Sequence, residues 1–217
     1  MTASAALAKI AAGPKRKVEP VVRQPATLVD AANLLRAWLR DPRSVGALAP
    51  SGHALARLMT AGIEHARGPV IELGPGTGVF TRALLERGLP WSQLALVEAD
   101  PQLATALARR HPQARVLRMD AAELGRTPSL FGDERAVAVV SGLPLLSLPA
   151  DKVAAIVEGV FNRHLRHDGA FYQFTYGLHC PLSHELRERL GLTAERLGIA
   201  WLNLPPAWVW RIRRQVH

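Results

Sequence analysis

Acidic residues and glycines in the first half of the chain have the spacing of a nucleotide-binding turn. Glu72 is followed at alternate positions by Gly74, Gly76 and Gly78, between a short apolar run and a helical pattern. Glycine adopts positive φ and lets the backbone approach a ligand, and the following helix offers unpaired N–H groups at its start. Glu98 stands about 20 residues further on, where an acid in a nucleotide-binding βαβ unit accepts the ribose hydroxyls.

A third acid, Asp120, follows the next expected strand, Arg115 to Met119, and is placed to accept a hydrogen bond from the amino group of an adenine. The carboxyl ends of parallel strands share one edge of a sheet, where open α/β folds bind ligands. The glycine spacing departs from the G-x-G-x-x-G dinucleotide fingerprint. The stretch from Glu72 to Gly78 instead resembles the first motif of class I S-adenosylmethionine-dependent methyltransferases, in which the acid suits the cationic amino-acid tail. The resemblance implies S-adenosylmethionine as cofactor and S-adenosylhomocysteine as product.

The elements that must position these residues follow from the apolar pattern. Strands and helices alternate, which indicates an α/β fold with a parallel sheet. With the motif, this predicts a Rossmann-like class I methyltransferase fold, a mostly parallel seven-stranded sheet with helices on both faces. Strands are expected over residues 94–98, 115–119, 136–140 and 169–175, with a closing pair over 197–204 and 207–213, and helices over 53–65, 79–87 and the stretch from Val153 to Phe161.

The N-terminal part is expected to lie outside the methyltransferase core, which spans residues 67–217. Residues 1–26 are rich in Ala, Lys, Arg and Pro, which predicts a basic flexible arm. An amphipathic helix is expected to begin at Thr27. It either packs on the core or lies in a lipid interface with Trp38 at headgroup depth. Residues 27–66 are therefore interpreted as N-terminal helices that form a membrane or substrate cap.

The chain is strongly basic, with 27 Lys and Arg against 18 Asp and Glu among 217 residues and a formal net charge of +9. This balance favours an anionic partner, either nucleic acid or a membrane surface with acidic lipids. The longest apolar stretch, residues 136–150, is shorter than the ~20 residues that a spanning helix needs. Cys180 is the single cysteine, which favours a reducing compartment. The expected location is cytoplasmic and peripheral to the inner membrane, with the anionic surface bound through residues 1–40.

The segment from Ser141 to Leu145 bears on the methyl acceptor. Methyltransferases that act on exocyclic adenine nitrogens have Asn or Asp, a variable residue, Pro and an aromatic residue at this point. Here Pro144 is kept, but the amide or acid and the aromatic side chain that would hold a flipped base are missing. The segment argues against a nucleic-acid substrate.

Five segments together resemble the bacterial phospholipid N-methyltransferases of the rhizobial type: residues 46–51, 72–80, 141–145, 173–177 and 203–210. The glycine motif is shared by the whole superfamily, so the discrimination depends on the serine-glycine-leucine-proline, tyrosine-glycine and double-proline segments. Members of this family methylate phosphatidylethanolamine and its methylated forms toward phosphatidylcholine, which implies a phospholipid acceptor. Similar proteins methylate ribosomal adenine or ornithine lipids, and these stay as alternatives, beside a binding module that keeps the fold without the reaction.

The resemblance also implies a set of site residues. Tyr176 and Ser141 are the expected catalytic residues, with Tyr176 bonded to the amine or facing the growing ammonium through its ring. The alternative for Tyr176 is an interfacial tyrosine with a satisfied hydroxyl, and Tyr172 is interpreted as core. No metal site is expected, and His164 and His167 are interpreted as a solvated helix end. The expected cofactor-binding residues are Ser51, Glu72, Gly74, Gly76, Thr77, Gly78, Glu98, Ala99, Asp120, Ala121, Ser141 and Leu143.

Overall fold

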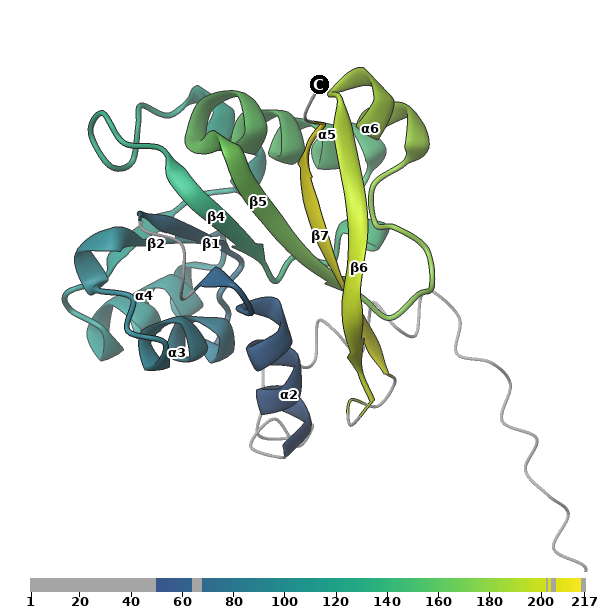
Figure 1. Ribbon diagram of the computed structural model, residues 1–217. Coiled ribbons are helices and arrows are strands. Elements are labelled where there is room, and N and C mark those ends of the chain that lie inside the picture. Colours follow the sequence, from purple (N-terminus) through teal and green to yellow (C-terminus); the bar gives the residue numbers. More distant parts are fainter. Residues whose placement is uncertain (1–49, 64–67, 202, 204–205, 216–217) are drawn as a thin grey trace, which may run out of the picture.

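The computed structural model describes residues 50–63, 68–201, 203 and 206–215 (Figure 1). Its strands are β1 (Val70–Leu73), β2 (Leu94–Glu98), β3 (Arg115–Arg118), β4 (Ala136–Ser141), β5 (Leu165–Thr175), β6 (Leu192–Ala200) and β7 (Ala207–Arg214). Its helices are α2 (Pro50–Met59), α3 (Val79–Glu86), α4 (Pro101–Arg110), α5 (Ala150–Gly159) and α6 (His184–Arg189), and the 3₁₀ segment η3 (Ala121–Arg126) follows β3.

The seven strands form one sheet in the order β3-β2-β1-β4-β5-β7-β6. Strands β1 to β5 are parallel, while β7 pairs antiparallel with both β5 and β6. The predicted fold class, a mostly parallel seven-stranded Rossmann-like sheet, is confirmed. The carboxyl ends of β1, β2, β4 and β5 therefore meet at one edge, as the placement of the acids requires.

An apolar core covers each face of the sheet. On one face, Val70, Leu96 and Val140 pack with side chains of α2, α3 and α4. On the other face, Ile71 and Val139 pack with side chains of η3, α5 and α6. Figure 1 shows the first three helices below the sheet and α5 and α6 above it. Since the central strands are buried on both faces, they are continuous apolar runs in the sequence.

Among the elements that differ from the expectations are α2, β6 and α6. The helix expected over residues 53–65 is α2, which ends at Met59 before a turn in which Gly62 has a φ of 83°. The first closing strand is not 197–204, because β6 begins at Leu192, opposite Arg214 of β7, and ends at Ala200. Helix α6 was not predicted, since its six residues carry little periodicity. Its start is marked by Ser183, whose hydroxyl accepts the N–H of Leu186 at 3.2 Å.

His164 corrects another expectation. Its side chain is not solvated but buried, with a relative exposure of 3%. Its ring Nε2 lies 2.8 Å from the carbonyl oxygen of Leu124 and 3.2 Å from the hydroxyl of Thr127. Burial lowers the pKa of His164, which favours the neutral ring. His164 thus joins the π-helical segment η5 (Val160–His164), which follows α5, to η3, and only His167 is exposed as expected.

Several N-terminal predictions lie outside the described residues. They are the basic arm over residues 1–26, the helix that begins at Thr27, the first part of the 46–51 segment and the boundary between residues 66 and 67. Within the described ranges, no helix is long and apolar enough to cross a bilayer.

Candidate active site

The turn between β1 and α3 reverses the chain through three glycines. Gly74, Gly76 and Gly78 have φ values of 64°, 56° and 83°, in the left-handed region that favours glycine. A Cβ on Gly74 would stand 2.7 Å from Cδ2 of Leu143, so the Leu143 side chain would have to move to admit any other residue. The N–H of Gly74 donates to the carbonyl oxygen of Val97 on β2 at 2.9 Å. The glycine motif thus forms the tight strand-to-helix turn that the sequence predicts.

Glu72 lies beneath this turn and is fully buried. Its Oε2 accepts the hydroxyl of Thr81 at 2.6 Å, and its Oε1 accepts the backbone N–H of Thr81 at 3.2 Å. Thr81 belongs to the first turn of α3, so the carboxyl group ties β1 to the helix that follows the glycines. Glu72 was expected to contact the amino-acid tail of the cofactor. This geometry instead favours a role in which Glu72 holds the glycine turn in place.

The variant Glu72→Gln is expected to change how stability depends on pH. Burial raises the pKa of Glu72 from 4.5 to about 8, against the opposing effect of the bonds from Thr81. Between these pH values the folded chain holds a proton that the unfolded chain has lost. The free energy of unfolding of the parent should therefore fall as pH rises through this window, by up to about 1.4 kcal/mol per pH unit.

Glutamine has the same shape and does not titrate, so the variant should lose this part of the slope. Urea unfolding at pH values from about 5 to about 8 measures the difference. Parallel curves for the two proteins would mean that Glu72 is ionised in the folded chain across the whole window.

Glu98 ends β2 beside the glycine turn and is 7% exposed. Its Oε2 accepts the N–H of Gly76 at 3.0 Å, and its Oε1 accepts the N–H of Asp100 at 2.9 Å. These two bonds fix the carboxylate against the turn. Each carboxylate oxygen keeps further acceptor capacity, so both oxygens remain able to accept hydroxyl groups of a ligand. The geometry is compatible with the expected ribose role.

Asp120 follows β3 and caps η3, where its Oδ1 accepts the N–H of Ala122 at 3.0 Å. Its Oδ2 forms an ion pair at 2.5 Å with the ammonium group of Lys152 on α5. Burial acts to raise the pKa of Asp120, but the bonds from Lys152 and Ala122 outweigh it and the net shift is downward. The carboxylate is therefore ionised at neutral pH. An adenine amino group placed here would share Asp120 with Lys152.

The loop after β4 is held in place from β5 by Gln173. The amide Nε2 of Gln173 donates to the carbonyl oxygens of Leu143 and Phe174, each at 2.9 Å. Ser141 is fully buried, and its hydroxyl accepts the N–H of Leu143 at 3.4 Å. This favours a structural role for Ser141 over the expected catalytic one. Leu145, where adenine methyltransferases have an aromatic residue, is 2% exposed in the core.

Tyr176 lies just beyond β5 and is half-buried. Its ring packs edge-on against Phe174 with centroids 5.7 Å apart, and Phe174 contacts Phe80 of α3 at 5.9 Å. This row of rings connects Tyr176 to the helix that begins at the glycine turn. Burial raises the pKa of Tyr176 to about 12, although a hydrogen bond from the side chain of Asn203 opposes the shift. Tyr172 is a core residue, as predicted, with 5% exposure.

Of the other expected cofactor residues, Thr77, Ala99 and Ala121 follow β1, β2 and β3 at the same edge of the sheet. Thr77 is in the glycine turn, and its carbonyl oxygen accepts from the guanidinium of Arg110 at 3.1 Å. Ala99 follows Glu98 and is exposed, whereas Ala121 is buried. Ser51 lies in the first turn of α2, and its side chain falls outside what the structure describes. In the described ranges, no group of three His, Cys, Asp or Glu side chains could hold a metal ion.

Sequence reasoning missed Lys152, Gln173 and Asn203. Gln173 and Asn203 are buried, and within the described part of the chain Gln173 Oε1 and Asn203 Oδ1 have no hydrogen-bond partner. Buried acceptors of this kind usually have a partner, so they are candidates for contact with a ligand N–H group. The signal available in the sequence was a polar residue inside an apolar segment, as Gln173 is between Tyr172 and Phe174.

The chain is similar to two kinds of characterised protein. It is 34% identical to the ornithine lipid N-methyltransferase of Singulisphaera acidiphila over 143 residues, which cover 64% of this chain and 73% of that protein. It is 42% identical to the ribosomal RNA small subunit methyltransferase A of Afipia carboxidovorans over 95 residues, which cover 40% of this chain and 32% of that protein. The second match thus spans about a third of its relative. No protein-family model matches the chain.

Solved structures show the same architecture. A TehB-like SAM-dependent methyltransferase from Corynebacterium glutamicum has a TM-score of 0.58 and 19% identity, covering 87% of this chain and 100% of that one. The 1,6-didemethyltoxoflavin-N1-methyltransferase of Burkholderia thailandensis, solved with S-adenosylhomocysteine, has a TM-score of 0.57 and 19% identity, covering 91% of this chain and 94% of that one. At such identities the likeness concerns the fold.

Proposed function

This chain belongs to the class I S-adenosylmethionine-dependent methyltransferases, and on that premise we propose that it methylates the amine of a membrane lipid. Its cofactor is S-adenosylmethionine and S-adenosylhomocysteine is the product. The acceptors that we propose are phosphatidylethanolamine and its methylated forms, leading to phosphatidylcholine. Ornithine lipid is the second candidate, because the relative that is 34% identical over 143 residues is named for methylation of that lipid.

The structure of the loop after β4 is the observation that favours a lipid acceptor over an RNA acceptor. A flipped base is held by stacking and by hydrogen bonds to its edge. In this loop Leu145 is packed in the core, and Gly142 has no side chain where an amide or acid would stand. A Cβ on Gly142 would lie 2.7 Å from the carbonyl oxygen of Gly74, so the glycine turn itself excludes a larger residue. The loop therefore lacks the side chains of a base clamp.

The residues at the sheet edge fit S-adenosylmethionine by their chemistry. The glycine turn leaves no side chain between the backbone and a ligand at Gly74, and Glu98 offers carboxylate oxygens to the ribose hydroxyls. Asp120 offers an ionised carboxylate to the adenine amino group. Glu72 supports the glycine turn through its bonds to Thr81. When bound, the cofactor supplies an electrophilic methyl group.

The chain must then hold the acceptor amine unprotonated and in line, and tolerate the positive charge that develops on it. We propose Tyr176 for this task. Its phenolic oxygen is hydrogen-bonded to Asn203 and keeps a second lone pair that can accept an N–H of the amine. The face of its ring attracts a methylated ammonium group. We further propose that residues 27–66 form a substrate-side cap and that residues 1–40 bind an anionic membrane surface, which would place the enzyme at the inner face of a membrane.

The decisive experiment presents the full chain with methyl-labelled S-adenosylmethionine and one of three acceptors. The acceptors are vesicles with phosphatidylethanolamine, vesicles with ornithine lipid, and small-subunit ribosomal RNA. We expect label in phosphatidylethanolamine at a rate at least about tenfold above that in RNA, since discrimination by a site lacking the partner groups is of this order or greater.

Label in ornithine lipid alone would select the second candidate. Label in RNA alone would refute the lipid proposal, and donor binding without any transfer would identify a binding module.

A further inference from the structure

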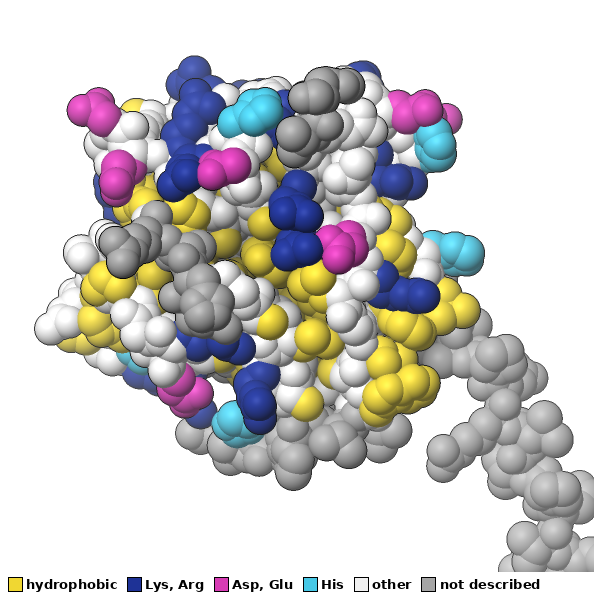
Figure 2. Space-filling model, in the orientation of Figure 1, with side chains coloured by type: hydrophobic (Ala, Val, Ile, Leu, Met, Phe, Trp, Pro, Cys, Tyr) yellow, Lys and Arg dark blue, Asp and Glu magenta, His cyan; other side chains and the backbone are white. Residues whose placement is uncertain are grey.

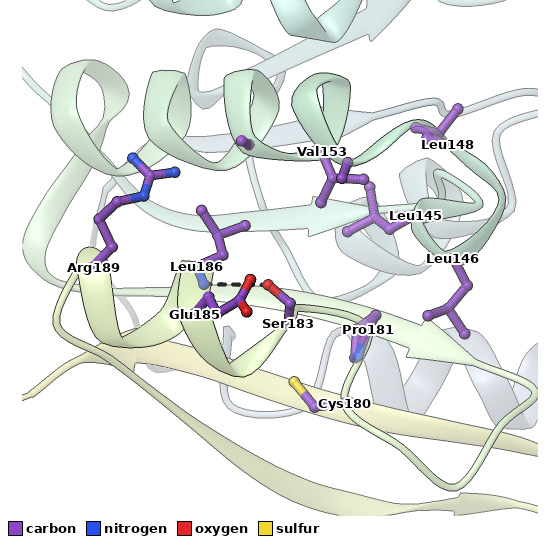
Figure 3. Close-up of a pocket in the computed structure, with 12 residues that line it drawn as sticks. Leu145, Leu146, Leu148, Val153, Cys180, Pro181, Ser183, Glu185, Leu186 and Arg189 are labelled. Carbon is purple, nitrogen blue, oxygen red and sulfur yellow. Dashed lines mark hydrogen bonds between the residues drawn. The ribbon is translucent and has the colours of Figure 1, made fainter.

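An apolar groove opens beside the loop that follows β4. It has a volume of about 510 Å³ and lies between α5 and the segment from Cys180 to Arg189 (Figure 3). Leu145, Leu148 and Val153 form one wall, and Leu186 belongs to the other. The volume falls in the range of small-molecule sites.

The polar groups that line the groove are largely engaged elsewhere. The hydroxyl of Ser183 accepts the N–H of Leu186 and caps α6, as the dashed line in Figure 3 shows. The guanidinium of Arg189 pairs with Glu158 of α5 at 2.6 Å, which joins the two helices at the end of the groove remote from the loop. Glu185 of α6 is the remaining charged side chain of the lining, and it is exposed. A polar ligand needs several placed hydrogen-bond partners, which a single carboxylate does not supply. The groove suits an unbranched apolar chain.

The open end of the groove lies at the edge of the sheet where methyl transfer is proposed. Leu145 and Leu146 of its lining come directly after the loop that Gln173 holds. Leu146 is 46% exposed, Leu178 63% and Trp201 69%, and these are the large exposed apolar side chains of the described residues. They follow β4, β5 and β6, three strands with the same direction, so all three belong to one edge.

Side chains around Trp201 extend this apolar rim. The ring of Trp201 lies 6.5 Å from that of Trp208, over which the guanidinium of Arg196 stands at 4.4 Å. Figure 2 shows hydrophobic side chains gathered where the β6–β7 hairpin ends, low on the right of the view. Exposed apolar groups that cluster on one surface mark an interaction site, and tryptophan with arginine suits the boundary of a bilayer.

We propose that the groove between α5 and α6 binds an acyl chain of the lipid acceptor, which enters over the rim formed by Leu146 and Leu178. The proposal rests on the proposed lipid methylation and adds the site for the apolar part of the substrate. The lipid headgroup then lies at the loop after β4, and the acyl chain runs along α5 toward Arg189. Binding of the acyl chain positions the lipid amine at the edge of the sheet, so no separate set of residues is needed to hold the headgroup.

The test fills the groove from within. Ala154 lines it on α5 and is half-buried at the edge of the core, so Ala154→Trp places a large side chain in the groove. Ala155→Trp is the matched control, on the same helix and half-buried but outside the lining. The transfer rate is measured with dihexanoyl and with dipalmitoyl phosphatidylethanolamine in the same detergent, and with the corresponding ornithine lipids if those are the acceptors.

We expect Ala154→Trp to raise KM for the long-chain lipid about tenfold or more and to leave the short-chain value nearly unchanged. Each buried methylene group changes affinity about fourfold. Loss of burial for two or three methylene groups of the acyl chain is therefore enough for the expected rise of about tenfold in KM. Ala155→Trp should change neither value. Equal effects of Ala154→Trp on both chain lengths, or none on either, would overturn the proposal.

A binding measurement separates this proposal from that of the reaction. The probe is cis-parinaric acid, a fluorescent fatty acid, titrated into the full chain. Binding that is lost in Ala154→Trp and kept in Ala155→Trp supports the groove even if no lipid is methylated. If the protein methylates lipids but Ala154→Trp still binds parinaric acid like the parent, the groove proposal is refuted and the proposed function is not. If Ala154→Trp does not fold, Leu146→Glu places a charge at the exposed mouth, and the same outcomes are expected of it.

Discussion

Glu98→Ala is expected to weaken the binding of S-adenosylmethionine about 10- to 100-fold. Hydrogen bonds to a charged group contribute about 1.5–3 kcal/mol, and the variant removes those that Glu98 would make with the ribose. It also releases the N–H of Gly76, which the carboxylate holds at 3.0 Å. Both effects act on the same ligand, because Gly76 belongs to the turn that cradles it. Equilibrium titration of the full chain with the donor measures the affinity.

Two variants separate these effects. Glu98→Gln keeps the shape and one acceptor oxygen but not the charge, so its affinity should lie between those of the parent and the alanine variant. Asp168→Ala removes an exposed acid near the amino end of β5, where it pairs with Arg166 at 2.6 Å, and should leave donor affinity unchanged. A parent-like affinity of Glu98→Ala would remove Glu98 from the ribose site.

The strands of the parallel half could be predicted almost residue by residue. Strand β2 has the expected bounds, and β3 and β4 differ from theirs by one residue. Strands β2 and β4 are buried on both faces, so each appears in the sequence as an unbroken apolar run bounded by polar or turn residues. The edge strand β3 has an exposed arginine at each end, and it was found from its place in the alternation of strands and helices. The amino end of β5 was missed because Arg166, His167 and Asp168 are exposed there, which hides the strand from an apolar pattern.

The site was predictable in its backbone and not in its side-chain partners. Spacing alone located the glycine turn and the acids at the strand ends. Lys152 reaches Asp120 from a helix whose register the sequence does not fix, and Gln173 reaches the loop after β4 only because β5 lies next to β4 in the sheet. Asn203 reaches Tyr176 from the β6–β7 connection. Such contacts depend on how elements pack, and a single sequence carries no direct signal of them.

Glu72 illustrates a further limit. The motif predicts an acid before the glycines, but it does not say which atoms the acid contacts. In the structure, both carboxyl oxygens of Glu72 accept hydrogen bonds from Thr81, which lies nine residues further along the chain. An acid that binds the protein's own backbone and an acid that binds the ligand have the same position in the motif, and only geometry separates them.

Tyr176→Phe is expected to lower turnover about 10- to 100-fold while changing donor affinity by less than about twofold. The variant removes one hydrogen bond to a group that gains positive charge during transfer, a contribution of about 1.5–3 kcal/mol. Because burial raises the pKa of Tyr176 to about 12, the parent hydroxyl is neutral at physiological pH. The loss should therefore not depend on pH between about 6 and 9. Steady-state rates with saturating donor, beside a donor titration, test both parts.

Tyr176→Leu distinguishes the hydroxyl from the ring. Phenylalanine keeps the edge-on contact with Phe174 and the ring face toward a methylated ammonium, whereas leucine removes both. If the hydroxyl positions the amine, Phe and Leu lose turnover on the first methylation alike. If the ring stabilises the cation, the phenylalanine variant retains the later methylations, in which the acceptor already carries methyl groups, and leucine does not. Turnover equal to the parent in both variants would leave Tyr176 as an interfacial residue whose hydroxyl is satisfied by Asn203.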